Sequence, residues 1–248
     1  MFIDTHCHLD FEIFDDSRDD IIEECKSLNI NKFINPATSF SNWQELIHVR
    51  EKFSNISICF GLHPIFIEKH SQVHIEQLKK YTLENNCKLI GEIGLDKRFN
   101  NFDKQIDTFS QQLNIAKELN KKVIIHSVKT HNEIIKIIKD TSFTNGGIIH
   151  AFNGTYQEAK TFINLGFKLG IGGILSHPTA KLKDTLHKVS YKDIVLETDS
   201  PDMNLYDSKE SINKPQNIIK IFDLLKNLYM EDPDILEQQI YKNSLELT

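Results

Sequence analysis

The sequence predicts an α/β fold, a single-domain (β/α)8 TIM barrel over residues 1–248. Three observations predict it. The length of 248 residues is close to the roughly 250 typical of such barrels. Short apolar runs alternate with longer amphipathic stretches, as parallel strands alternate with the helices that cover them. Acidic and histidine residues follow the apolar runs directly, which is where barrel enzymes build their active sites.

Eight apolar, β-rich runs are predicted to be strands, and they start about 20 to 35 residues apart, the pitch of a βα unit. They are Phe2–Asp4, Lys32–Pro36, Ile56–Gly61, Lys88–Gly94, Lys122–His126, Gly147–Ala151, Phe167–Gly172 and Asp193–Thr198. Helical patterns between them include Arg18–Leu28, Asn42–Phe53, Asp103–Leu119 and His131–Lys139. An open doubly wound sheet would usually carry a glycine-rich turn after its first strand. This chain has THCHLD there instead.

Composition and charge narrow the class of protein. There is no long apolar run and no cationic leader at the N-terminus, so neither a membrane span nor a secretory signal is predicted. The four cysteines form no CxxC pair, which favours a reducing, cytoplasmic location. A net charge of −6 argues against a binder of nucleic acid that relies on a broad basic surface. It is compatible with an enzyme that holds phosphate through metal ions. No protein partner is predicted.

The first strand runs into Asp4-Thr5-His6-Cys7-His8. In an extended segment alternate residues share a face, so His6 and His8 point one way together with Asp4, and Cys7 points the other. Two imidazoles at this spacing can reach one metal ion. The alternative is a polar turn with incidental histidines.

Three further strand ends carry potential ligands. Glu92 interrupts an apolar run between two glycines, and burying its carboxylate without a metal or a cationic partner would be costly. A buried salt bridge is the alternative. His126 and His150 end the fifth and sixth strands. Either alone would more often be a satisfied core histidine, but their equivalent barrel positions favour ligation.

The eighth strand ends in Glu197 and Asp199. Asp199 is predicted to be a metal ligand, with a helix N-cap as the alternative, and Glu197 a partner behind the ligands. Six predicted ligands exceed the three or so of one catalytic zinc, so two divalent ions are expected, with Mg²⁺, Mn²⁺ or Zn²⁺ left open. The six are His6, His8, Glu92, His126, His150 and Asp199.

Six motifs, in order, resemble those of the TatD family of metal-dependent deoxyribonucleases: DTHCHLD, GLHP, GEIGLD, IIHS, IIHAFNG and LETDSPD. The resemblance extends from Phe2 to Ser244. It implies an amidohydrolase-like barrel and DNA as the substrate. It also implies that His6, His8 and Asp199 hold one ion and that His126 and His150 hold the other. Glu92 would bridge the two ions, a role that comes from the resemblance alone.

The chain departs from the family pattern in two places. An arginine that often follows the fifth-strand histidine and serine is replaced by Val128-Lys129, and Lys129 is a weaker phosphate ligand by geometry. The arginine-asparagine-x-proline signature reads Ile212-Asn213-Lys214-Pro215. His63, Lys129 and Asn213 are expected to hold the phosphate; a packed turn residue is the alternative for His63.

The predicted reaction is attack of a metal-activated water on a phosphodiester. Glu92 and Asp199 are the predicted catalytic residues, and Asp199 would orient the water or accept its proton. One alternative is metal-dependent hydrolysis of an amide, a lactone or an aminoacyl ester on the same fold. Many binuclear amidohydrolases bridge their ions with a carboxylated lysine where this chain has Glu92, which favours the nuclease. A second alternative is a non-enzymatic scaffold that has kept a metal site. A complete ligand set argues against it.

Overall fold

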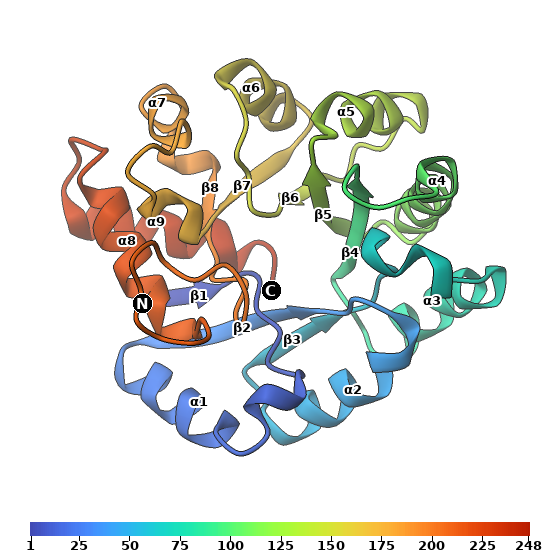
Figure 1. Cartoon of the computed structure of the whole chain (residues 1–248), viewed down its shortest axis with the longest axis horizontal. Helices are drawn as coiled ribbons and strands as arrows, with labels where there is room; N and C mark the ends of the chain where they lie inside the picture. The colour runs from blue at the N-terminus through green and yellow to red at the C-terminus, as the bar shows by residue number, and fades with distance from the viewer.

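The computed structural model describes residues 1–248 and contains eight parallel strands in chain order. Helices surround them on the outside (Figure 1). The strands are β1 (Phe2–Asp4), β2 (Ile30–Pro36), β3 (Ile56–Cys59), β4 (Leu89–Asp96), β5 (Lys122–Val128), β6 (Gly147–Ile149), β7 (Phe167–Ile171) and β8 (Ile194–Leu196). The helices are α1 (Arg18–Ser27), α2 (Trp43–Lys52), α3 (Gln72–Glu84), α4 (Phe102–Glu118), α5 (His131–Asp140), α6 (Tyr156–Asn164), α7 (Leu182–Leu186), α8 (Ile218–Lys226) and α9 (Pro233–Leu245).

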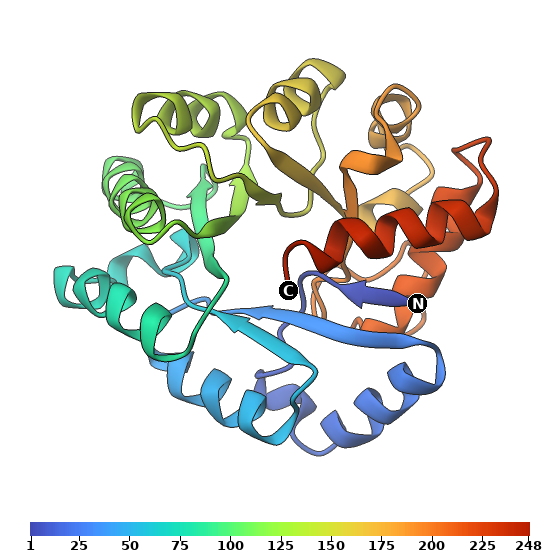
Figure 2. The same cartoon turned by 180° about the vertical axis from the view of Figure 1, so that it is seen from behind.

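The strands pair in the order β1-β2-β3 and β4-β5-β6-β7-β8. Between β3 and β4 the ladder narrows to one bridge, Phe60 with Ile90. Between β8 and β1 the Thr5 amide donates to the Leu196 carbonyl at 3.0 Å. These joins complete the ring, and the predicted (β/α)8 class is confirmed. Seen from behind, α9 crosses beside β1 and β8, on which it packs (Figure 2).

The barrel interior is filled by one apolar layer, as expected of a packed core. Its members come from β2 to β6, from β8 and from the residues after α9: Ile34, Cys59, Leu89, Ile124, Ile148, Val195 and Leu247. A larger apolar cluster joins the outer faces of the strands to the helices. The site residues described below follow this interior layer along the strands. None of the helices combines the length and apolar character that crossing a bilayer requires.

The strand ends differ from the predicted ones by a few residues. β6 and β8 end earlier than predicted, at Ile149 and Leu196. The backbone leaves the extended region shortly afterwards, with φ angles of 45° at Ala151 and 58° at Asp199. β4 runs on to Asp96 because Asp96 continues the ladder opposite Val128. The extension of β4 matters for the site, because it aligns Asp96 with the residues of β5.

Candidate metal centre

The six predicted ligands converge at the carboxyl ends of the strands. The segment after β1 is tied to the segment after β8 by two backbone hydrogen bonds, from the Asp199 amide to the His6 carbonyl and from the His8 amide to the Ser200 carbonyl, both 2.8 Å. The His6 and His8 rings then meet, with their Nε2 atoms 3.2 Å apart. Cys7 is buried and its Sγ faces the Ile34 carbonyl at 3.9 Å, directed away as predicted.

Glu92 occupies the middle of the cluster and is 2% exposed. Its Oε2 lies 3.2 Å from His6 Nε2, and its Oε1 lies 2.9 Å from His126 Nδ1. Burial opposes ionisation of this carboxyl, but His63, His6 and His150 outweigh burial and hold the pKa of Glu92 well below its usual value. The ionised carboxylate therefore faces histidines with both of its oxygens.

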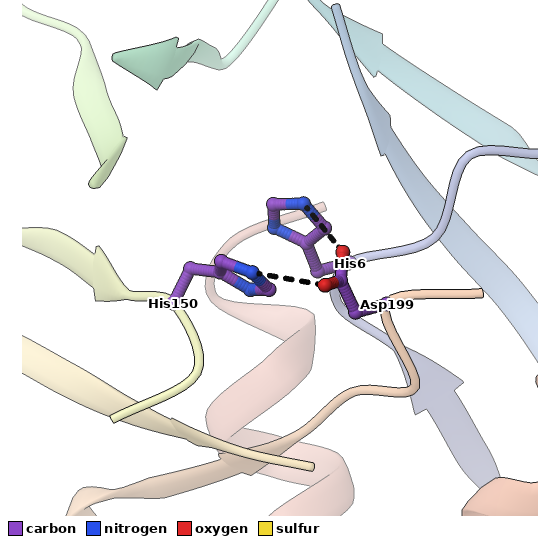
Figure 3. Close-up of side chains that lie close together, drawn as sticks. All are labelled: His6, His150 and Asp199. Carbon is purple, nitrogen blue, oxygen red and sulfur yellow. Dashed lines mark ion pairs between the residues drawn. The ribbon is translucent and has the colours of Figure 1, made fainter. Parts of the chain in front are cut away.

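Asp199 stands on the opposite side of the same cluster. Its Oδ1 lies 3.5 Å from Nε2 of both His6 and His8, and its Oδ2 lies 3.5 Å from His150 Nε2. Figure 3 shows this carboxylate between the His6 and His150 side chains. Burial would raise the pKa of Asp199, but the histidines, above all His150, lower it far below the ordinary range. Asp199 is thus an anion among imidazoles.

The chemistry of these donors fits divalent cations. Three sets of donor atoms each lie within 4.8 Å of one another: those of His6, His150 and Asp199; of His6, His8 and Glu92; and of His63, Glu92 and His126. Imidazole and carboxylate donors together suit Zn²⁺, Mn²⁺ and related ions. The only ion-pair partners of Glu92 and Asp199 are histidines. One buried carboxylate and one that is 15% exposed, without a lysine or an arginine, call for another source of positive charge.

Two of the histidines have a carboxylate behind them. His150 Nδ1 lies 2.9 Å from Glu197 Oε1, and His126 Nε2 lies 3.0 Å from Asp96 Oδ2. Histidines that bind metals usually turn their second nitrogen to such a group, which fixes the ring and its tautomer. The arrangement assigns His150 Nε2 and His126 Nδ1 to the cluster. Burial lowers the pKa of His126, but Asp96 and Glu92 outweigh burial and raise it.

Sequence reasoning foresaw the partner role of Glu197 but missed Asp96. Asp96 is completely buried and lies four residues after Glu92 in β4. The even spacing within one strand could have found it, because residues i and i+4 of a strand share a face. The predicted strand ended at Gly94, two residues before Asp96, and no role was predicted for Asp96.

His63 lies against Glu92. Its Nδ1 accepts a hydrogen bond from the Ile65 amide at 3.1 Å, and burial lowers its pKa to about 4. A neutral imidazole that accepts at one nitrogen carries its proton on the other. His63 Nε2 therefore carries that proton, 3.2 Å from Glu92 Oε1. In this arrangement the Nε2–H of His63 faces Glu92.

The other two residues expected to bind the phosphate lie in different surroundings. Lys129 lines the cavity described below. Asn213 does not, and its predicted contact with the phosphate is wrong. Its side chain is fully buried, its Nδ2 donates to the Thr198 and Met203 carbonyls, and its Oδ1 accepts from Lys214 N and Asn217 Nδ2. Every polar atom of this amide is engaged in holding the chain after β8.

Asp4 also departs from the simple alternation. Its carboxylate accepts the Thr198 amide at 2.9 Å and lies 2.5 Å from Thr198 Oγ1. It therefore joins β1 to the segment after β8 and takes no place among the converging donor atoms.

A cavity of about 1480 Å³ opens over the cluster. Glu92, His126, His150 and Asp199 lie in its wall, and its remaining lining comes largely from the segments after β4, β5, β6 and β7. Pockets for small ligands usually measure about 300–1,000 Å³. The cavity therefore has room for a ligand larger than a single small molecule.

Comparisons with known proteins give one consistent answer. Residues 3–248 match the model of the family described as TatD related DNase. The chain is 34% identical to a protein of Escherichia coli (strain K12) named uncharacterized metal-dependent hydrolase YjjV, over 99% of this chain and 97% of that one. It is 30% identical to an uncharacterized metal-dependent hydrolase of Haemophilus influenzae, over 99% and 98% of the two chains.

Solved structures agree with these matches. The crystal structure of YjjV, a TatD homologue from Escherichia coli, superposes with a TM-score of 0.94 at 33% identity, over 99% of this chain and 97% of that one. A TatD family hydrolase from Entamoeba histolytica superposes with a TM-score of 0.89 at 18% identity, over 99% and 97% of the two chains, which supports the fold alone.

Proposed function

Because the chain belongs to the TatD-related DNase family, we propose that it is a metal-dependent hydrolase that cleaves phosphodiester bonds of DNA. The observation that carries the proposal is the position of Glu92. One of its oxygens faces His6 and the other faces His126, so this carboxylate belongs to two sets of donor atoms. The size of the cavity also supports a long substrate over a single small molecule.

His6, His8, Glu92 and Asp199 would hold one divalent ion, and Glu92, His126 and His150 a second. When bound, two such ions activate water and stabilise the entering and leaving oxygens of an in-line displacement. Asp199 orients the attacking water and accepts its proton, since its carboxylate borders both sets of ligands. The Nε2–H of His63 faces Glu92 Oε1 at 3.2 Å and keeps that carboxylate turned towards the other ligands.

The test uses pure protein with end-labelled single- and double-stranded DNA, in the presence of Mg²⁺, Mn²⁺ or Zn²⁺ or of EDTA. Shortened products that form with a metal and vanish with EDTA are expected. Glu92→Gln should lower the rate at least about a hundredfold, since even groups behind a metal ligand contribute 10- to 100-fold. A parallel panel holds a carboxylic ester, a lactone, an amide and an aminoacyl ester. Turnover of that panel with none on DNA would refute the nuclease assignment and leave the hydrolase.

A further inference from the structure

One wall of the cavity carries an arginine that the metal centre does not use. Arg98 follows β4 and its side chain is 56% exposed. The other two arginines of the chain form hydrogen bonds with backbone carbonyls: Arg18 donates to the Leu9 carbonyl and Arg50 to the Asn85 carbonyl. Arg98 is therefore the arginine that a ligand in the cavity can reach.

The orientation of the Arg98 guanidinium is set by hydrogen bonds within the protein. Its Nε donates to Oδ1 and Oδ2 of Asp96 at 3.0 and 3.1 Å, and its Nη2 donates to Oδ2 at 2.6 Å. Asp96 is itself held in place, because it is fully buried and its backbone amide donates a hydrogen bond to Gln105 Oε1 at 2.9 Å. A guanidinium has five N–H donors. The Nη1 edge has no partner in the protein and stays free for a ligand.

The charged side chains around Arg98 are compatible with a bound anion. Lys97 is paired with Glu133, and the Asp96 carboxylate is shared between Arg98 and His126. Lys129, on the neighbouring segment, has no ion-pair partner. The two segments lie side by side, since the Lys97 amide donates to the Val128 carbonyl at 3.2 Å. Arg98 and Lys129 thus put two cations on one wall.

We infer that Arg98 binds an anionic group of the substrate outside the metal centre, namely a phosphate that flanks the scissile one. Asp96 separates Arg98 from His126, so an anion on Arg98 is not the group held by the ions. A planar guanidinium presented edge-on is suited to phosphate oxygens. The choice of a nucleic-acid phosphate rests on the proposed function; the anion site itself rests on the geometry of Arg98.

The test compares Arg98→Ala and Arg98→Lys with Arg50→Gln. The last removes one positive charge at a position outside the cavity. Binding of a fluorescein-labelled hexathymidylate is followed by anisotropy, in Ca²⁺ and again in EDTA. Hydrolysis of the same unlabelled hexamer is compared with that of bis(p-nitrophenyl) phosphate, which has no flanking phosphate. Bound metal is measured for every variant.

Arg98→Ala should weaken binding of the hexamer about tenfold, the scale of one charged hydrogen bond, and should raise KM more than it lowers kcat. Arg98→Lys should lie between, while Arg50→Gln should match the wild type. Hydrolysis of bis(p-nitrophenyl) phosphate and bound metal should change less than twofold.

Unchanged hexamer binding in Arg98→Ala would overturn the inference, as would a wild type that does not bind the hexamer. An equal loss on both substrates would also overturn it, because Arg98 would then act only through Asp96 and His126. If no phosphodiester is hydrolysed by any variant, the nuclease assignment fails, and the binding comparison still decides the role of Arg98.

Discussion

At the scale of single residues, the site depends on which nitrogen of each histidine faces the cluster. His126 presents Nδ1 to Glu92 and turns Nε2 to Asp96, whereas His150 presents Nε2 to Asp199 and turns Nδ1 to Glu197. Asp96 fixes the His126 ring through a contact of 3.0 Å with Nε2, whereas Glu197 lies 2.9 Å from His150 Nδ1 without a hydrogen bond between them. We therefore expect ligation by His126 to depend on Asp96, a residue outside the converging donor sets.

Asp96→Asn tests this dependence. Asparagine keeps the shape but loses the charge that holds His126 Nε2, so metal affinity and turnover should each fall about 10- to 100-fold. Isothermal titration with Mn²⁺ measures the affinity. Glu158→Gln is the matched control, because Glu158 also pairs with a histidine, His131, in the cavity wall but outside the cluster. Equal Mn²⁺ affinity in Asp96→Asn and the wild type would contradict the proposed orientation.

Substitutions of His63 test whether its imidazole proton is on Nε2. Because Nε2 carries the proton, His63→Ala should keep the full complement of bound metal and lose about tenfold or more in turnover, the scale of a lost hydrogen bond to a charged group. His63→Gln, which can still donate, should recover part of the loss. Metal content by plasma emission spectrometry is the readout. Loss of one ion per chain on substitution to alanine would show that His63 is a ligand.

The residue types at the strand ends could be predicted from the sequence, because ionisable groups rarely interrupt apolar runs without a partner. Glu92 was predicted in this way, His6 from the alternation of an extended segment, and His150 from its place at a strand end. The orientation of a ring and the partners of a buried amide depend on contacts between distant segments. Asn213 shows the limit: four hydrogen bonds occupy its amide, and nothing in its local sequence indicates them.

At the scale of elements, the pairing of β4 with β5 places Gly94 opposite His126. Glu92, two residues earlier in β4, reaches the His126 ring with its side chain. The two strands are in close contact at Gly94, where an added Cβ would lie 2.0 Å from the His126 carbonyl oxygen. Gly94 also has a φ of 146°, which disfavours other residues. This glycine therefore sets the distance between the strands that carry Glu92 and His126.

Gly94→Ala should displace β5 and lower both stability and Mn²⁺ affinity. A loss of about 1–3 kcal/mol in the free energy of unfolding is expected, the usual cost of overpacking. Gly166→Ala is the control: its φ is 85°, but the nearest atom to an added Cβ is 3.6 Å away. That variant should lose stability and keep its Mn²⁺ affinity. Unchanged affinity in Gly94→Ala would contradict the link between this contact and the site.

The elements themselves were mostly predictable. The alternation of short apolar runs with longer amphipathic stretches located all eight strands, because each buried run is bounded by helical pattern or turn residues. The carboxyl ends of the strands were less predictable. There the backbone leaves the extended region, at Ala151 and Asp199, and tertiary contacts decide where the ladder stops. Those ends are where the site is built.

At the scale of the whole molecule, the site joins segments from both ends of the chain, since His6 lies near the start and Asp199 follows the last strand. Bound ions would therefore connect the segments after β8 and β1, two strands that are joined by few backbone hydrogen bonds. A ligand that binds only the folded state stabilises it by about 2.7 kcal/mol at a hundred times its Kd.

Addition of Mn²⁺ to EDTA-treated protein should consequently raise Tm by roughly 5–10 °C, given about 2–4 °C per kcal/mol for a chain of this size. Differential scanning calorimetry measures the shift. Glu92→Gln should show less than half of it, because the shared ligand is lost. A Tm that is the same with EDTA and with Mn²⁺ would count against ions held between the two ends of the chain.

The most direct test of the account is anomalous diffraction from crystals of the wild type soaked in Mn²⁺. Two anomalous peaks per chain should flank the Glu92 carboxylate, about 3.5–4 Å apart, one beside His6, His8 and Asp199 and the other beside His126 and His150. A single peak, or peaks that do not touch Glu92, would contradict the claim that this carboxylate joins two metal sites.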